Sequence, residues 1–560
     1  MWWWGGGGNA APAKPAAATV TPASISLAFD FNDSVPVSIS VTPTTPLVDG
    51  SFIFALTEKG PLDTLQLGGL LERQPDGSYR LDLSVPHPDT LDTLDTTARR
   101  GKLQFHACTG QIFPCATEPP GWPVEIPYEA VIKPMRNQKP LAPIPGLSDW
   151  AAVQGNAAHN GYVPATFDPT AFSRRWNQPL GGLSQLSTSI GLVFGIAHGK
   201  VQALRESDGT LAWEVSIDPY GAISAPAVSD GFAYVMVAKR GAGTDPAPTR
   251  QLWILDAGTG AIRSKVDVPA ATVTPPSAAR ASTGSARTLA SCISSDSPTN
   301  FDEPGPASAP YFATPVIGGE SGYMEIADGG MLAFTVSDGT TRWLTPQGNV
   351  GHDYSFSDTD HDPKLVATDD RYVYSYIVES LQRSGLYALN RADGSLAFRI
   401  DGGAQNASVL DNHGPILGSK GFALVANRGY GLLGFDLVSK RLQYSIPILV
   451  STSPSLANGV VYVGNDATLE ARRESDGSLL WSWTADEPLI ANVIATDNLV
   501  FISTTKRTYA IDLRTHQSVW QFDRHGALML SAQGVLYIKH DLGTFDCFSH
   551  PFLLVAVNLL

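Results

Sequence analysis

The segment from Gly351 to Pro363 holds the densest group of side chains that could do chemistry. Three aspartates stand there at alternate positions, namely Asp358, Asp360 and Asp362. Carboxylate oxygens are the ligands that Ca²⁺ prefers, so the segment is a candidate calcium loop. However, Pro363 stands where an EF-hand loop places its turning Gly, and no Glu follows at the required distance. A solvated acidic loop without metal is therefore the competing interpretation.

Further polar side chains occur at loop positions that would connect one repeated unit to the next. They are His352, Asp353, Asp411, Asn412, His413, Arg524 and His525. Loops of this kind gather at one face of a closed ring, so we expect these residues to line one binding mouth. Tyr354 and Phe356 stand in the same segment as His352, and their rings would suit a carbohydrate ligand.

The four cysteines bear on the redox compartment. Cys108 and Cys115 bracket a Gly/Pro turn that could bring both sulfurs together. In an exported protein this pattern predicts a loop-closing disulfide. Zinc is the alternative, but no second Cys/His pair stands nearby at ligand spacing. Cys292 and Cys547 are far apart in the sequence, and we expect both to be free thiols.

Length and composition narrow the class of protein. The chain has 560 residues, 43% hydrophobic and 16% charged, which is too apolar for a disordered protein and too long for one ordinary domain. Its formal net charge is −15 at pH 7, and no basic stripe is present. Because nucleic-acid binding needs Lys and Arg against phosphates, no DNA or RNA partner is expected. No apolar run is long enough to span a membrane as a helix.

Residues 1–22 are predicted to be a flexible tether, because residues 10–22 are rich in Ala, Pro and Thr. A Gly run before such a tether is typical of bacterial lipoproteins after the lipidated cysteine, although no cysteine stands here. The first residues also lack the basic start and apolar middle of a secretory signal. We therefore expect the natural start to lie upstream and the protein to be exported to the periplasm or the outer membrane. A cytosolic protein with an unpacked head is the alternative.

Residues 23–134 are predicted to form a β-sandwich of immunoglobulin-like type. Five runs of alternating apolar and polar residues support this prediction, namely 35–41, 52–56, 79–85, 102–106 and 124–128. No arrangement typical of a catalytic site occurs in them. Residues 135–149 contain Pro140, Pro143 and Pro145 and are predicted to be a stiff linker.

From Trp150 onward the chain contains an internal repeat of strands, a turn, and an aromatic residue four positions after the turn. The turn positions are Gly209, Gly260, Gly339, Gly394, Lys440, Gly477 and His516. The positions four residues later are Trp213, Ser264, Trp343, Phe398, Tyr444, Trp481 and Trp520. A period of about 40 residues with insertions is typical of four-stranded propeller blades. The longest interval contains residues 269–310, a Ser/Ala/Thr/Pro-rich segment predicted to be a flexible insertion.

The residues of the repeat also predict how the ring is held together and closed. Gly suits the positive-φ position of a tight turn, and the aromatic residue then lies on the outermost strand over the gap to the next blade. The chain ends after a run typical of a third strand, whereas an extra outer strand containing Trp176 precedes the first full repeat. We therefore predict an all-β protein with an eight-bladed β-propeller over residues 150–560, whose last blade is closed by the Trp176 strand. Seven blades is the alternative if the longest interval is misjudged.

These repeats resemble those of the pyrroloquinoline-quinone-like propeller family, which read Ala-Leu-Asp-x-x-Thr-Gly-x-x-x-Trp. Leu255-Asp-Ala-Gly-Thr-Gly260 is the nearest copy, and residues 150–161 are similar to the segment before the first blade of that family. The family includes quinoprotein dehydrogenases and the non-enzymatic BamB family of outer-membrane assembly lipoproteins. The resemblance therefore implies a fold more firmly than a function.

A dehydrogenase is the less favoured implication of this resemblance. Quinone-using members often carry two adjacent cysteines beside the cofactor, and neither a Cys-Cys pair nor the Cys-x-x-Cys-His of a haem site occurs here. The cluster that holds calcium against the quinone, and the aspartate base, find no individual match. The repeat tryptophans are expected to pack between blades. We accordingly assign no catalytic residue and no cofactor, do not expect pyrroloquinoline quinone, and keep Ca²⁺ as the candidate metal of the acidic segment.

The sequence as a whole predicts a non-catalytic binding or scaffold protein of the bacterial cell envelope. It would act as a monomer and recognise a protein partner or an envelope ligand through loops at one propeller face. The alternatives are a quinone- or metal-dependent oxidoreductase and a carbohydrate-binding protein.

Overall fold

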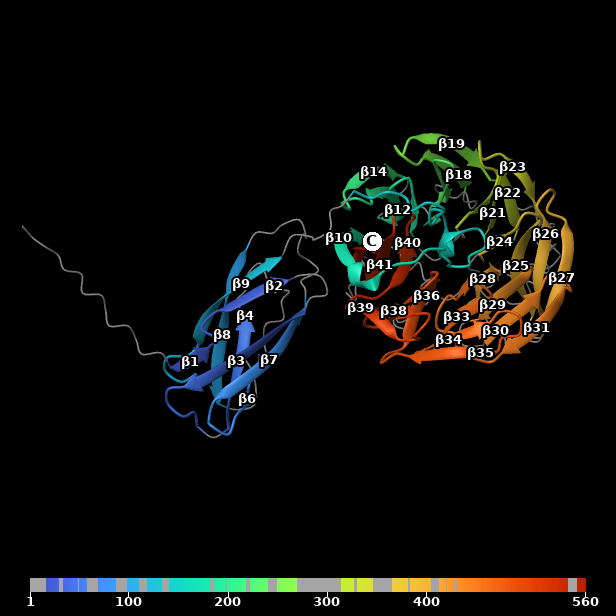
Figure 1. Cartoon of the computed structure of the whole chain (residues 1–560). Coiled ribbons are helices and arrows are strands. Elements are labelled where there is room, and N and C mark those ends of the chain that lie inside the picture. The colour runs from blue at the N-terminus through green and yellow to red at the C-terminus, as the bar shows by residue number, and fades with distance from the viewer. Residues whose placement is uncertain are drawn as a thin grey trace, which may run out of the picture. The chain divides into compact units, whose positions relative to one another are not determined.

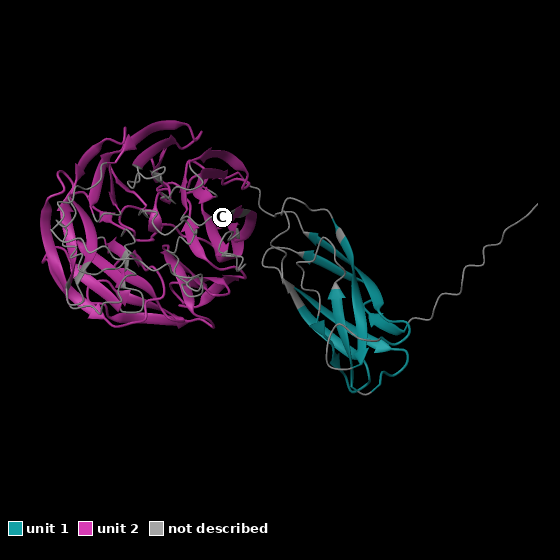
Figure 2. Ribbon diagram, turned by 180° about the vertical axis from the view of Figure 1, so that it is seen from behind, with its two compact units in different colours: residues 1–136 teal, residues 137–560 magenta. Residues whose placement is uncertain are grey.

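The computed structural model describes residues 17–29, 34–48, 50–57, 69–86, 98–109, 118–132, 140–181, 186–197, 199–217, 222–239, 249–268, 314–326, 330–345, 365–380, 383–403, 412–418, 420–427, 431–541 and 551–560. Apart from two short 3₁₀ helices, η1 (Val153–Gly155) and η2 (Pro169–Ala171), the regular structure in these residues is β-strand. The chain forms two compact units, residues 1–136 and 137–560 (Figure 2). Within the described residues, no helix is long and apolar enough to cross a membrane.

The first unit is a β-sandwich of two sheets, with the strand orders β1-β3-β7-β6 and β2-β9-β8-β4-β5. Leu27, Ile39, Leu103 and Phe105 are fully buried in one core to which both sheets contribute. The strands are β1 (Ala18–Thr21), β2 (Ile25–Phe29), β3 (Ser34–Pro43), β4 (Ser51–Thr57), β5 (Gly69–Leu70), β6 (Glu72–Arg73), β7 (Tyr79–Pro86), β8 (Arg99–Thr109) and β9 (Val124–Ile132).

The five strands predicted for this unit are present as β3, β4, β7, β8 and β9. The predicted tether of residues 1–22 was too long, because Ala18–Thr21 forms β1 and pairs with β3. Buried and exposed side chains alternate in this segment, as they do in a strand. A pattern of only four residues between Ala- and Pro-rich neighbours was too short to predict a strand from the sequence. The immunoglobulin-like assignment stays a prediction. Cys108 is disulfide-bonded, and Cys115 lies outside the described residues, so the predicted pairing is untested.

The second unit is a β-propeller, whose described residues form eight sheets arranged in a ring (Figure 1). We call these sheets blades 1 to 8 and count the strands of each from the ring axis outward. Blade 1 contains β11 (Ser187–Ser189), β12 (Leu192–Ala197), β13 (Lys200–Arg205) and β14 (Leu211–Ser216); blade 2 contains β15 (Ala222–Ile223), β16 (Ala227–Ser229), β17 (Phe232–Lys239), β18 (Thr249–Asp256) and β19 (Ile262–Asp267); blade 3 contains β20 (Val316–Gly318), β21 (Ser321–Glu325), β22 (Met331–Thr335) and β23 (Thr341–Leu344); blade 4 contains β24 (Ala367–Thr368), β25 (Tyr372–Ser380), β26 (Arg383–Asn390) and β27 (Leu396–Gly403).

The remaining blades follow the same order. Blade 5 contains β28 (Asn412–Leu417), β29 (Phe422–Asn427), β30 (Gly431–Asp436) and β31 (Arg441–Ile446); blade 6 contains β32 (Ser455–Ala457), β33 (Val460–Asn465), β34 (Thr468–Arg473) and β35 (Leu479–Thr484); blade 7 contains β36 (Leu489–Ala495), β37 (Leu499–Thr504), β38 (Thr508–Asp512) and β39 (Ser518–Phe522); blade 8 contains β40 (Ala527–Leu530), β41 (Val535–Asp541), β42 (Pro551–Asn558) and β10 (Ser173–Gly181). The predicted insertion at residues 269–310 lies outside the described residues.

Blade 8 joins the two ends of the propeller sequence. β10 pairs antiparallel with β42, and Trp176 stands opposite Ala556. The closing strand that the sequence predicted from Trp176 is therefore present. Part of the predicted linker also packs on this blade, since the Ile144 N–H donates to the carbonyl of Ala532 at 2.8 Å.

The aromatic residues of the outer strands bind the next blade, as the repeat predicted. Each indole N–H in three of these contacts donates to a backbone carbonyl beside the turn of the next blade. The pairs are Trp176 with Glu206 (2.8 Å), Trp213 with Ala257 (2.9 Å) and Trp343 with Arg391 (2.8 Å). Because these indoles are buried, each bond satisfies a donor that would otherwise be costly to bury.

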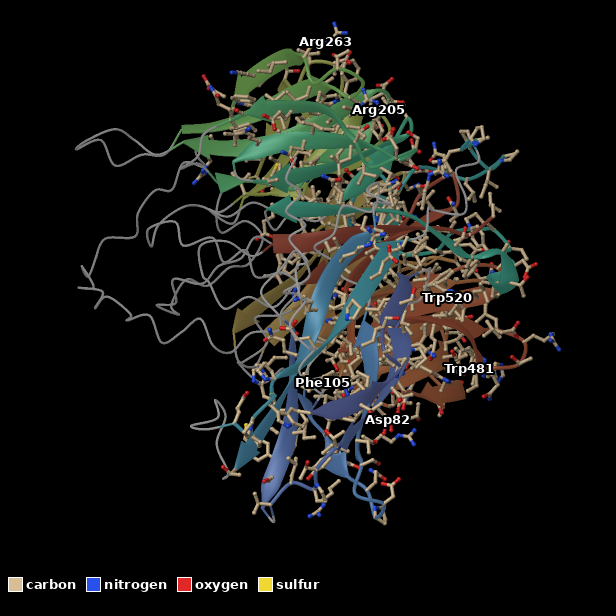
Figure 3. All side chains as sticks on the ribbon, turned by 90° about the vertical axis from the view of Figure 1, so that its left-hand side faces the viewer. Asp82, Phe105, Arg205, Arg263, Trp481 and Trp520 are labelled. Atoms are coloured by element: carbon tan, nitrogen blue, oxygen red, sulfur yellow. The ribbon has the colours of Figure 1, made fainter. Side chains whose placement is uncertain are left out.

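The turn residues leave room for these rings. Gly260 has a φ of 73°, and an added Cβ would lie 2.6 Å from a ring carbon of Trp213. His516 replaces the turn Gly in blade 7, keeps a φ of 58°, and stacks on Trp481 with ring centroids 4.5 Å apart (Trp481 is labelled in Figure 3). The turn therefore keeps its positive φ without a glycine, and the imidazole of His516 lies against the indole of Trp481.

Blade 2 has Ser264 where the other repeats place an aromatic residue. The hydroxyl of Tyr234 on β17 donates instead to the carbonyl of Val336 at 3.0 Å. That carbonyl occupies the same place in the repeat as those of Ala257 and Arg391, three residues before the turn Gly. A buried tyrosine therefore supplies the hydrogen bond that a tryptophan supplies elsewhere.

Residues 150–167, which we call the axial segment, run along the inner strands of the ring (cyan in Figure 1). Main-chain hydrogen bonds join this segment to six blades. They are Thr188 N to Trp150 O (2.8 Å), Val228 N to Ala151 O (2.9 Å), Thr368 N to Ala157 O (2.9 Å), Leu417 N to Ala158 O (2.8 Å), Leu456 N to Asn160 O (2.7 Å) and Val163 N to Ala495 O (2.9 Å). Within it His159 is buried, and burial lowers its pKa to about 4 because the charged imidazolium is disfavoured there.

We predict that Gly260→Ala destabilises the propeller more than Gly191→Ala. Both glycines have positive φ, but an added Cβ on Gly191 meets nothing within 4 Å, whereas on Gly260 it meets Trp213. The control should lose about 1 kcal/mol from backbone strain, and Gly260→Ala about 2–4 kcal/mol because ring displacement is added. Denaturation midpoints followed by tryptophan fluorescence measure both, and equal losses would contradict the contact.

Acid should weaken the fold through His159. Its folded pKa of about 4 lies below the ordinary value of 6.5, so the unfolded chain takes up the proton first as the pH falls. Its contribution to stability is fully present above pH 6.5 and is lost between pH 6.5 and about 4. His159→Asn, which tolerates the local φ of 55°, should show a smaller fall in Tm than wild type from pH 7 to 5, and parallel curves would refute the assignment.

Candidate functional site

The strand order fixes which turns share a face of the ring. Each blade has an antiparallel sheet with four strand positions counted outward, so its outer strand ends at the face of the ring where its inner strand began. The next inner strand starts from that same face, and all inner strands therefore run in the same direction. The connections into them therefore lie at one face, together with the turns between the second and third strands. We call this the loop face. The structure describes it over blades 6 to 8 at residues 447–454, 466–467, 485–488, 505–507 and 523–526.

Four of the predicted binding residues fall in the described part of the chain. Arg524 and His525 lie in the connection from β39 to β40. Asn412 and His413 begin β28, the inner strand of blade 5, so their backbone stands at the same face. The predicted residues outside the described part of the chain are His352, Asp353, Tyr354, Phe356, Asp358, Asp360, Asp362 and Asp411. The calcium loop and the carbohydrate site consequently stay predictions.

Contacts with blades 7 and 8 position the connection that carries Arg524 and His525. Thr508 Oγ1 donates to the carbonyl of Arg524 at 2.8 Å. Gly526 has a φ of 143°, and an added Cβ would overlap the carbonyl oxygen of Lys539 on β41. Only a residue without a side chain allows the connection to approach β41 this closely.

Two imidazole rings meet beside this connection. The rings of His525 and His540 contact edge to face, with centroids 4.6 Å apart and planes at 86°. Nδ1 of His540 lies 3.0 Å from the carbonyl oxygen of His525. The contact fixes both rings relative to the backbone of the loop face.

An ionic network covers the loop face of blade 7. Arg507 Nε donates to Asp523 Oδ1 at 2.8 Å, and its Nη1 lies 3.8 Å from Asp486 Oδ2. Tyr509 donates its hydroxyl to Asp486 Oδ1 at 2.9 Å. The turn between β37 and β38 is thereby joined to the connections on both sides of blade 7.

The partners in this network keep its basic groups charged. The hydrogen bond to Glu487 raises the pKa of Lys506, and the contacts with Tyr509 and then Asp523 raise the pKa of Arg507. Burial, followed by the bond to Asp486, raises the pKa of Tyr509, which stays a neutral donor at pH 7. The face thus presents positioned charges of both signs and hydrogen-bonding groups, an arrangement that can recognise a polar protein surface.

Sequence reasoning missed most of the network, although a signal for it existed. Lys506 and Arg507 stand between two strand runs of the seventh repeat, where the turn between second and third strands must fall. Their acidic partners come from connections that are neighbours only after the blades have packed. The missed residues are Asp486, Glu487, Lys506, Arg507, Tyr509, Asp523 and His540.

Near the loop-face ends of β10, β12 and β41, a small apolar cleft lies between blades 8 and 1. It is lined in part by Leu180, Phe194, Ile196, Phe552 and Leu554. Among the described residues, no group of three or more His, Cys, Asp or Glu side chains is placed to hold a metal ion.

Comparisons with known proteins agree on the fold. A family model described as "Outer membrane protein assembly factor BamB" matches residues 160–429 and 447–545. Among solved structures, BamB from Moraxella catarrhalis is 14% identical, with 69% of this chain and 98% of that chain covered and a TM-score of 0.44. A europium-containing methanol dehydrogenase is 11% identical (73% and 98% covered, TM-score 0.50). The quinohemoprotein alcohol dehydrogenase ADHIIG from Pseudomonas putida HK5 is 12% identical (73% and 80% covered, TM-score 0.51).

A search of the curated proteins gives no match. At these identities the likeness to the two dehydrogenases shows the fold alone and does not transfer an activity.

We predict that Gly526→Ala displaces the connection that carries Arg524 and His525, because the new Cβ would overlap Lys539 O. Amide hydrogen exchange over residues 523–530 should become at least about tenfold faster, since the connection must leave β41. The matched control is Gly231→Ala, where φ is also positive, at 80°, and nothing lies within 4 Å of an added Cβ. Unchanged exchange in Gly526→Ala would contradict this role of the glycine.

Proposed function

Because the chain belongs to the family described as outer membrane protein assembly factor BamB, we propose that it is a non-catalytic scaffold that contributes to outer-membrane protein assembly. The observation that carries the proposal is the match of the family model to residues 160–429 and 447–545, which covers most of the propeller. The protein would work in the periplasm or at the outer membrane. Its ligand would be a protein of the assembly machinery.

Recognition would take place at the loop face. The network around Arg507 joins three loop-face segments by hydrogen bonds and ion pairs, so they present a pre-formed surface to a partner. Pre-organised loops lose little conformational freedom on binding, which favours affinity. Charges of both signs would select the partner and its orientation more than they would supply raw affinity.

The blades would contribute stiffness. The axial segment ties six inner strands together, and the outer aromatic residues join neighbouring blades. The loop connections therefore cannot move independently of the ring. The sandwich unit would serve as a spacer or as a second binding surface, and the predicted Cys108–Cys115 disulfide would suit an oxidising compartment.

Site-specific photo-crosslinking in the native cells tests this proposal. A photoreactive amino acid would replace Lys506 or Arg524 on the loop face, and Asp208 or Asp476 in turns on the opposite face as matched controls. We expect the loop-face positions to crosslink to a component of the outer-membrane barrel-assembly machinery, and the turn positions not to do so.

A second readout in the same cells is the amount of folded outer-membrane barrel proteins after the chain is removed. We expect that amount to fall and to recover when the wild-type chain is restored. An unchanged amount, or crosslinks to the machinery from the control turns alone, would contradict the proposal.

A further inference from the structure

A fully buried carboxyl group stands where the first and last parts of the propeller sequence meet. Glu206 follows β13 in blade 1 and has no exposed surface. Its Oε2 accepts a hydrogen bond at 2.9 Å from Oγ of Ser531, a residue 325 positions later in blade 8. Its Oε1 makes no hydrogen bond of good geometry. The carbonyl of Glu206 meanwhile accepts the indole N–H of Trp176, so both ends of this residue bind blade 8.

The position that Glu206 occupies lies between blades throughout the ring. In each blade the residue three positions before the turn donates its N–H to the carbonyl of the turn between the first two strands; for Glu206 this acceptor is Gly191. The equivalent residues in blades 2 to 7 are Ala257, Val336, Arg391, Leu437, Glu474 and Leu513. Four of these are apolar, as expected for a site that is buried between packed sheets. A carboxyl group at this place must therefore be explained by its surroundings.

The charged and titratable groups around Glu206 only partly favour a negative charge. Arg175 on β10 is also buried, but its Nε donates to the carbonyl of Ser207 at 2.7 Å and its Nη1 to Asn558 Oδ1 at 3.2 Å. Asp149, which precedes the axial segment, brings a second negative charge to the same region.

Two further groups complete the surroundings. The fully buried hydroxyl of Tyr537 on β41 interacts with the carboxyl group of Glu206, without good hydrogen-bond geometry. Asp208 lies in the same turn as Glu206 and interacts with Arg175. The Tyr537 hydroxyl can donate to an ionised Glu206 and to that extent favours the charged form, whereas a protonated Glu206 can itself donate to the Tyr537 oxygen.

Burial raises the pKa of Glu206 to about 8, and the negative charge of Asp149 acts in the same direction. Ser531, Tyr537 and Arg175 oppose this rise without cancelling it. The neutral carboxylic acid is therefore the form that the folded ring favours at pH 7.

We propose that Glu206 is a protonation-controlled latch of the ring closure. With its proton, the side chain bridges blade 1 to Ser531 in blade 8 without a buried charge. Without the proton, an incompletely paired charge lies between the two blades, and the contact between the first and last parts of the propeller loosens.

The sign of the pH dependence follows from the same geometry. The folded ring holds its proton up to about pH 8, whereas the unfolded chain releases it near 4.5. The stabilising contribution is thus fully present below pH 4.5 and is lost as the pH rises to about 8. The latch is strongest in acid and weakens progressively up to about pH 8.

Hydrogen exchange of the intact chain at pH 6 and pH 9, corrected for the intrinsic rates, tests the latch. In wild type, β10 and β40–β42 should lose protection by about tenfold or more relative to β33 on going from pH 6 to pH 9, because each pH unit between the unfolded and folded pKa values changes the opening equilibrium about tenfold. Glu206→Gln, which stays neutral, should keep the same protection at both pH values. Glu474→Gln, at the equivalent place in blade 6, should behave like wild type at the blade 8–blade 1 contact.

Infrared spectroscopy gives an independent readout that needs no change in stability. The wild-type spectrum at pH 7 should contain the carbonyl band of a protonated carboxylic acid. The Glu206→Gln spectrum at the same pH should lack that band. If Glu206→Gln fails to fold, the band is followed in wild type and Glu474→Gln from pH 6 to 9, where a titration near pH 8 supports the latch. The absence of that band, or a loss of protection in Glu206→Gln already at pH 6, would overturn it.

Discussion

In most blades of this propeller the outer strand carries an aromatic ring that packs on the turn of the next blade, and this contact joins neighbouring sheets. A four-stranded sheet alone leaves both faces exposed to water, so blades are stable only when stacked. The contact explains the turn residues: Gly260 leaves room for Trp213, and the carbonyl of Ala257 accepts its indole N–H. Where one partner changes, another side chain takes over, as Tyr234 does in blade 2.

A repeated contact of this kind requires the last blade to meet the first. β10 supplies the missing outer strand, so the ring closes through residues near the two ends of the propeller sequence. The axial segment reinforces closure from the inside by binding six inner strands. Glu206 stands at this junction, and it is the place where a titratable group lies buried between the first and last blades.

The same architecture explains why the fold is easier to recognise than the function. Packing constrains the strands, the turns and the aromatic residues, and these recur at a spacing that is visible in the sequence. The loop-face network of Arg507, Asp486 and Asp523 lies apart from the contacts between rings and turns, so the repeat pattern does not report it. The assignment to an assembly scaffold accordingly comes from the family match, and the loop geometry indicates where a partner would bind.

The sequence by itself determined the features that are local and repeated. Alternating apolar residues identified five strands of the sandwich, and the turn with its aromatic residue identified the blades and the closing strand of Trp176. A short, weak signal failed at Ala18–Thr21, where four residues form a strand only because β3 is there to pair with them.

Only the tertiary structure decided the contacts between distant residues. Tyr234 and Val336, Arg507 and Asp486, and Glu206 and Ser531 stand at no fixed spacing in the sequence, so no periodic pattern reports them. Their proximity follows from the way whole blades stack, and a carboxylate that would be an ordinary surface charge on one sheet becomes a buried acid between two. The chemistry of the candidate site and of the latch therefore depends on burial and neighbours, which the chain acquires only when the ring has closed.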